Sequence, residues 1–135
     1  PVRFTPEEGA KMLSCHAISP DGKSVVLTDS ENRLAVYPTS GGASSPLKNL
    51  EQGFWMIRWT NDGENIFVWR RGEVPAIVYK YNLASGKKEK WLELMPQDAT
   101  GVYKINSVKL TPDGKTYAYS YVRESSDLFL MEDLK

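Results

Sequence analysis

Short apolar runs, separated by polar turns, follow one another along this chain in the same order three times. The clearest runs are residues 25–27, 66–68 and 117–119, in which most side chains are β-branched or aromatic. In the segment before each of these runs, apolar residues stand mostly at alternate positions. Alternation with period two and a β-branched or aromatic composition both favour β-strands. The pattern therefore predicts a repeat protein built of short strands.

A five-residue corner joins the first two strands of each repeat. It reads SPDGK at residues 19–23, TNDGE at residues 60–64 and TPDGK at residues 111–115. Pro or Asn suits a type I turn, and Gly readily takes the positive φ that closes it. The corner predicts a three-residue hairpin loop in which the Asp and the hydroxyl side chain bond nearby backbone amides. We assign a structural role to the Asp-Gly pairs, which are Asp21, Gly22, Asp62, Gly63, Asp113 and Gly114.

Further apolar runs follow each corner, as expected for a sheet of several strands. Third runs occupy residues 34–37, 76–81 and 128–131. After a glycine-containing turn, weaker fourth runs occupy residues 46–50 and 89–94. Four short antiparallel strands per repeat are typical of a β-propeller blade. We therefore predict an all-β fold, a partial β-propeller of about three four-stranded antiparallel blades, the last of which lacks its outer strand.

We interpret residues 1–135 as a single β-propeller fragment. Its repeats span approximately residues 13–50, 54–94 and 104–135. Residues 1–9 are predicted to supply the outer strand of a preceding or partner blade, through the strand-like residues 2–5. The alternative is a hairpin between residues 2–5 and residues 10–13 across the Glu-Glu-Gly turn.

Three blades are fewer than the four or more of a typical propeller. An open wedge would expose a strand edge and two apolar blade faces, which favours association. We therefore expect a homodimer that completes a six-bladed ring, in which each N-terminal strand completes the third blade of the other copy.

Composition excludes several kinds of partner and site. Lys plus Arg and Asp plus Glu each number 17, so no net charge attracts nucleic acid. No apolar run approaches the ~18 residues of a membrane span, and no direct membrane contact is expected. A single His and a single Cys provide no zinc ligand set, and the Asp-Gly corners lack the ligand spacing of an EF-hand. We predict no catalytic residue, no metal site and no cofactor.

His16 and Cys15 are the two residues whose type could suggest chemistry. His16 takes the position that Ile57 and Val108 fill in the other repeats, so it is predicted to be buried or to line the central channel. No nucleophile and orienting group stand beside it in a recognised arrangement. Cys15 is interpreted as a small hydrophobic residue.

A candidate ligand rim lies at the end of the second strand of the second repeat. Trp69 is followed there by Arg70 and Arg71, and an aromatic ring beside two cations could hold an anionic or carbonyl ligand. The alternative is that Trp69 packs against the next blade while both arginines are solvated.

The recurring corner, with "SVVLTDSENRLAVYPTSGG" or "TYAYSYVRESSDLFLMEDLK" after it, resembles the TolB-like, WD-type β-propeller repeats of bacteria. The resemblance covers nearly all of the chain. The second corner departs from the pattern by Asn61 for Pro and Glu64 for Lys. More narrowly, three such repeats ending in "DLFLMEDLK" are similar to the C-terminal end of the propeller of acidobacterial Ser/Thr protein kinases.

The resemblance implies a non-catalytic module that binds a protein or small ligand, as the C-terminal part of the sensor domain of a bacterial Ser/Thr protein kinase. In a membrane-anchored kinase that sensor would lie on the extracytoplasmic side. The chain contains no G-x-G-x-x-G, H-R-D or D-F-G motif, so no kinase residue carries over. The alternative is a fragment of the substrate-gating propeller of a prolyl-oligopeptidase-type hydrolase, whose G-x-S-x-G elbow is also absent here.

Overall fold

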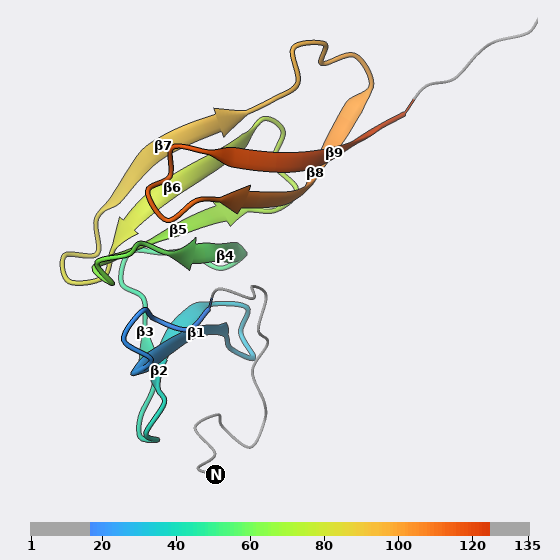
Figure 1. The fold of residues 1–135 in the computed structure, drawn as a ribbon. Coiled ribbons are helices and arrows are strands. Elements are labelled where there is room, and N and C mark those ends of the chain that lie inside the picture. Colours follow the sequence, from blue (N-terminus) through green and yellow to red (C-terminus); the bar gives the residue numbers. More distant parts are fainter. Residues whose placement is uncertain (1–16, 125–135) are drawn as a thin grey trace, which may run out of the picture.

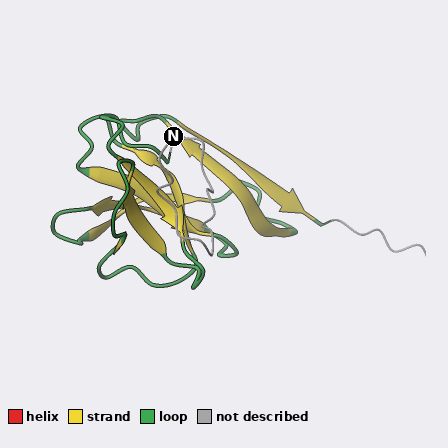
Figure 2. Cartoon of the chain, turned by 90° about the horizontal axis from the view of Figure 1, so that it is seen from below, coloured by secondary structure: helices red, strands yellow, loops and turns green. Residues whose placement is uncertain are grey.

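The computed structural model describes residues 17–124, and this part of the chain is made of strands and loops (Figures 1 and 2). Within residues 17–124, nine strands form three separate antiparallel sheets, ordered β1-β2-β3, β4-β5-β6-β7 and β8-β9. The strands are β1 (Ser24–Thr28), β2 (Leu34–Pro38), β3 (Ser45–Pro46), β4 (Phe54–Trp59), β5 (Asn65–Arg70), β6 (Ala76–Asn82), β7 (Lys88–Leu94), β8 (Val102–Leu110) and β9 (Tyr117–Arg123). The prediction of an all-β partial propeller is confirmed.

The second repeat forms a complete blade of four strands. Its strand β5 is apolar at four successive positions because both of its faces are covered. Ile66 and Val68 lie in the core shared with the first blade, while Phe67 and Trp69 lie in the core shared with the third. All four side chains are at most 3% exposed. A strand buried on both faces is expected to lose the alternation of polar and apolar residues.

The first repeat forms a blade of the same order with a shorter outer strand. An isolated bridge from Ile18 to Val25 places the start of this repeat beside β1, as β4 lies beside β5. The predicted fourth strand at residues 46–50 is reduced to the two residues of β3. Pro46 has no N–H to continue the ladder, and Asn49 turns the chain with a φ of +57°.

The third repeat contributes the hairpin of β8 and β9 within the described residues. The run predicted at residues 128–131 lies outside them, as do residues 1–9, Cys15 and His16. Residues 17–124 contain no helix with the length and apolarity that a membrane crossing requires.

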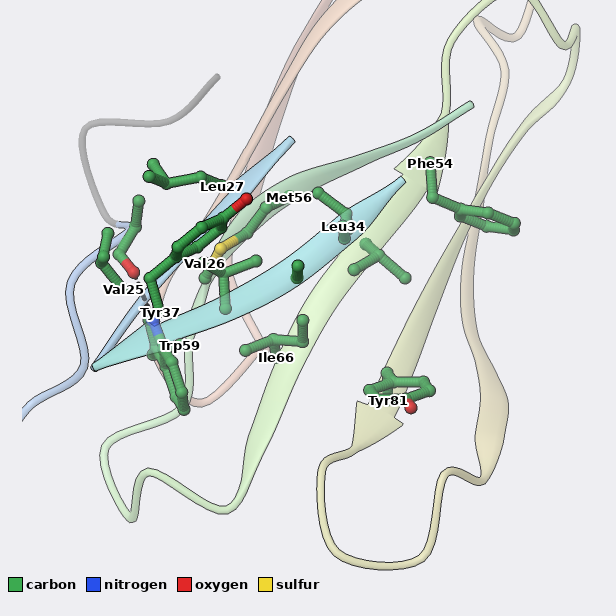
Figure 3. Packing of buried hydrophobic residues seen from close by; sticks show 13 residues of the cluster. Val25, Val26, Leu27, Leu34, Tyr37, Phe54, Met56, Trp59, Ile66 and Tyr81 are labelled. Carbon is green, nitrogen blue, oxygen red and sulfur yellow. Dashed lines mark hydrogen bonds between the residues drawn. The ribbon is translucent and has the colours of Figure 1, made fainter. Parts of the chain in front are cut away.

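Two hydrophobic cores hold the blades together, one on each side of the β4–β7 sheet. Figure 3 shows the first, in which Val26 and Leu34 of the first blade meet Met56 and Ile66 of the second. A tryptophan N–H crosses each boundary between blades to a backbone carbonyl. Trp59 donates to the carbonyl of Ala17 at 2.7 Å, and Trp91 donates to that of Gly114 at 2.9 Å. Since buried N–H groups need acceptors, these bonds help to set the position of each blade relative to its neighbour.

Candidate functional site

The three Asp-Gly corners have the same geometry. In each, the hydroxyl of the first residue donates to the Asp Oδ1, at 2.6 Å from Ser19, 2.5 Å from Thr60 and 2.6 Å from Thr111. The backbone N–H two residues after each Asp donates to the same oxygen at 2.9 Å. Each corner therefore closes on one carboxylate oxygen.

The corner loop is longer than the predicted three residues. Ser19 N–H donates to the carbonyl of Ser24, so four residues separate the paired positions. The N–H of Ser24 donates to the Ser19 hydroxyl at 3.0 Å in place of its carbonyl. The side chain thus completes the hairpin, which lets the loop take one more residue. Gly22, Gly63 and Gly114 have φ values of +73°, +71° and +71°.

The pKa of each corner carboxyl is held below its usual value of 3.8, for the same physical reason in the three repeats. For Asp21 the largest cause is the hydrogen bond from the Ser19 hydroxyl, followed by the one from the Lys23 N–H. Asp62 and Asp113 have the same two causes, with Thr60 and Thr111 as the hydroxyl donors. Donors aimed at the ionised form stabilise it, so these carboxylates stay charged at neutral pH.

We expect the lowered pKa values to make the free energy of unfolding decrease in acid. Because the pKa values of Asp21, Asp62 and Asp113 are lower in the folded chain, their contribution is present above the unfolded value of about 4 and is lost as pH falls through the folded values. Urea midpoints measured from pH 5 to pH 2.5 should fall, and carboxyl NMR titrations should show lowered pKa values for Asp21, Asp62 and Asp113, and also for Asp98, which accepts hydrogen bonds from Thr100. Ser19→Ala should raise the pKa of Asp21 alone. An unshifted Asp21 in the native chain would contradict this account.

Two of the three corners line one large pocket between the first and second blades. Its volume is about 710 Å³, within the range of pockets that hold ligands. The residues around it come from both corners, from β2 and β3, and from β4 and β6: Ser19, Pro20, Asp21, Ser24, Val36, Pro38, Ser45, Pro46, Leu47, Lys48, Trp59, Asn61, Asp62, Gly63, Tyr81 and Leu83. Figure 3 shows Trp59 and Tyr81, both buried, in the adjoining core.

The pocket exists because the outer strand of the first blade is short. Val25 pairs with Tyr37 as Ile66 pairs with Tyr81, so the two blades can be aligned residue by residue. In this alignment Pro46, which pairs with Ala35, corresponds to Lys90, which pairs with Tyr79. The residue that follows is Leu47 in the first blade and Trp91 in the second.

Trp91 fills the space in the second blade that is open in the first. Its ring packs on Phe67 at a centroid distance of 5.7 Å, and its N–H bonds Gly114 in the third corner. Gly114 is buried as a result, whereas Gly22 is exposed. The smaller Leu47 does not fill the equivalent space under the second corner, and Leu47 and Gly63 both line the pocket.

The candidate rim at Trp69, Arg70 and Arg71 has a different arrangement. Trp69 is 3% exposed and lies in the core between the second and third blades, edge-on to Trp55 at 6.5 Å. The pocket beside it measures only about 60 Å³, well below the size of a typical ligand pocket. This is the packing that the alternative interpretation describes for Trp69.

The two arginines of the candidate rim separate onto different rings. Arg70 lies over Phe54 at 5.0 Å and donates to the carbonyl of Gln52 at 2.9 Å. Arg71 lies over Trp55 at 4.6 Å and donates to Asn106 at 3.0 Å. Both guanidinium groups are thus engaged within the chain. Among residues 17–124, no cluster of three or more His, Cys, Asp or Glu side chains could hold a metal ion.

Comparison with solved structures supports the same fold. A TolB protein from Agrobacterium tumefaciens superposes with a TM-score of 0.54 at 20% identity, covering 76% of this chain and 35% of the TolB chain. The chain has a TolB-like propeller fold. No family model matches the chain. Pre-mRNA-processing factor 19 of Schizosaccharomyces pombe (strain 972 / ATCC 24843) is 29% identical over 130 residues, which is 86% of this chain.

Both similar proteins are considerably longer than the matched region. The chain spans 24% of pre-mRNA-processing factor 19 and 35% of the TolB chain. The structural comparison supports a TolB-like propeller fold.

Sequence reasoning identified the corners but missed the pocket they line. The available signal was the contrast between a fourth run that contains Pro46 and Leu47 and one that contains Lys90 and Trp91. That contrast indicates a pocket only once the strand register shows that Leu47 and Trp91 occupy corresponding positions.

Proposed function

We propose that this chain is a non-catalytic propeller module that binds a protein partner, as the C-terminal part of the sensor domain of a bacterial Ser/Thr protein kinase. The observation that carries the binding role is the pocket of about 710 Å³ between the first and second blades. A propeller packs its blades closely, so a pocket of this size at a boundary between blades leaves surface for a ligand. The alternative is that the chain is a fragment of the substrate-gating propeller of a prolyl-oligopeptidase-type hydrolase.

An affinity experiment tests the binding role. The folded chain is immobilised, extract of the source cells is passed over it, and each retained protein is purified and titrated against the chain by calorimetry. A partner should bind with one defined stoichiometry and should be lost when the chain is heat-denatured before it is immobilised. Retention that is equal for folded and unfolded chains, or no retention, would contradict a binding module.

The sequence upstream of residue 1 in the source genome tests the kinase context. The proposal expects G-x-G-x-x-G, H-R-D and D-F-G motifs in the same reading frame. A G-x-S-x-G elbow in that frame would support the hydrolase instead.

We also propose that two copies of the chain pair to complete a six-bladed ring. Residues 17–124 contribute three sheets, and two copies would together contribute six, within the range of a closed propeller. Light scattering should give twice the mass of the chain, and deletion of residues 1–5 should return the mass to that of one chain. A monomeric full chain, or a dimer that is indifferent to the deletion, would rule out this exchange.

A further inference from the structure

The pocket between the first and second blades has an apolar part among its mixed polar and apolar lining. Val36, Leu47 and Leu83 line it as partly buried side chains, beside the buried rings of Trp59 and Tyr81. The Tyr81 hydroxyl donates to the carbonyl of Lys48 at 2.6 Å, so its polar atom is already satisfied. An apolar part of this kind favours an apolar side chain, since burial there removes apolar surface from water.

Two negative charges stand at the mouth of the same pocket. Asp21 and Asp62 belong to neighbouring corners and are both exposed. Every hydrogen bond that the described residues make to these two carboxylates ends on Oδ1. Oδ2 of each Asp accepts none of these bonds, and Lys23 and Lys80 add weaker electrostatic attraction to Asp21 and Asp62 respectively. Among the described residues that line the pocket, Lys48 is the only cation.

A strand edge runs along one side of the pocket. β3 is the last strand in the order β1-β2-β3, and its two residues, Ser45 and Pro46, are both exposed and both line the pocket. An edge this short that contains Pro46, which has no N–H to donate, offers little backbone for strand pairing. A protein segment bound here is therefore expected to make its contacts mainly through side chains.

We propose that this pocket binds an extended segment of the protein partner that carries a large apolar side chain next to a Lys or Arg. The apolar side chain enters between Leu47 and Leu83, and the cation lies against Asp21 and Asp62. This inference rests on the proposed function, because it specifies the partner of a binding module.

Blocked tetrapeptides test the chemistry directly. Three peptides, GFRG, GFEG and GGRG, are each titrated into the ¹⁵N-labelled chain while amide shifts are followed. GFRG should shift the amides of Gly63, Leu47 and Leu83 in a saturable way, and its affinity should fall as salt is added. GFEG and GGRG should bind more weakly by about tenfold, because each lacks one of the two matching groups.

Matched corner variants separate the pocket from the turn. Asp62→Asn should weaken GFRG binding by about threefold to fivefold, the effect of an exposed ion pair. Asp113→Asn changes the same turn in the third repeat, where no corner residue lines this pocket, and should leave the affinity unchanged. The double variant Asp21→Asn, Asp62→Asn should lose about tenfold or more.

A filling variant tests the location. Leu47→Trp places at this position the residue that fills the equivalent space in the second blade, and it should abolish the shifts while far-ultraviolet circular dichroism is unchanged. If this variant does not fold, the corner variants decide the question.

Four results would overturn the inference: no peptide binds at 10 mM (about ten times a weak Kd of 1 mM), GFRG and GFEG bind equally, GGRG binds as well as GFRG, or Asp113→Asn is as harmful as Asp62→Asn. The proposed function has its own test: it is contradicted when the immobilised chain retains no partner, whatever the peptides do. A purified partner that binds the folded Leu47→Trp chain as tightly as the native chain would remove this inference and leave the binding module intact.

Discussion

Gly114→Ala is expected to lower the free energy of unfolding by about 3 to 5 kcal/mol, and Gly22→Ala by only about 1 to 2 kcal/mol. The two glycines occupy the same turn with φ values of +71° and +73°, so the cost of the left-handed backbone is the same. They differ in their surroundings. A Cβ on Gly114 would lie 2.5 Å from Trp91 Nε1 and 2.7 Å from Phe67 Cζ, whereas a Cβ on Gly22 would have no atom within 4 Å.

Urea unfolding of both variants, with the native chain alongside, measures the difference. Trp91→Ala supplies the control, because it removes one of the two rings that a new Cβ would strike and leaves Phe67 in place. In a double-mutant cycle, Gly114→Ala should cost less in the Trp91→Ala background than in the native chain. Equal costs for Gly22→Ala and Gly114→Ala would show that the clash is relieved by a small shift of the ring.

Phe67→Ala should lower the free energy of unfolding by about 3 to 5 kcal/mol. Phe67 is 0% exposed on the central strand of the complete blade and packs against Trp91 in the core shared with the third blade. Its removal leaves a cavity at the boundary between two blades, where the surrounding backbone is held by strand pairing on both sides of β5. Thermal and urea unfolding followed by tryptophan fluorescence measure the loss.

Tyr103→Ala is the matched control for this prediction. Tyr103 is 58% exposed on β8, so its truncation should change the free energy of unfolding by less than about 0.5 kcal/mol. A loss for Phe67→Ala that is as small as that for Tyr103→Ala would mean that the second and third blades are not packed as a common core.

The sequence by itself determined the class of fold and the position of the corners. Strand alternation is a local property, and the hydroxyl, Asp and Gly of each corner act within five residues of one another, as the bonds between Thr60, Asp62 and Asn65 illustrate. The period of the repeats then predicts the stacking of blades, because each sheet needs a neighbour to cover its apolar face. The loop was one residue longer than predicted because the Thr60 hydroxyl replaces a backbone acceptor.

Only the tertiary structure decided which corner is packed and which lines a pocket. The corners at Asp62 and Asp113 are nearly alike in sequence, yet the first faces Leu47 and the second faces Trp91. Trp91 belongs to β7 and Leu47 directly follows β3, the outer strands of the preceding blades, and strand register determines which residue lies beneath the corner. For the same reason the sequence left open whether Trp69 forms a ligand rim or packs between blades. The second strand of a blade has two faces, and only the neighbouring blade determines whether a ring on one of them is covered. The pocket is therefore a property of the boundary between two repeats, which no single repeat encodes.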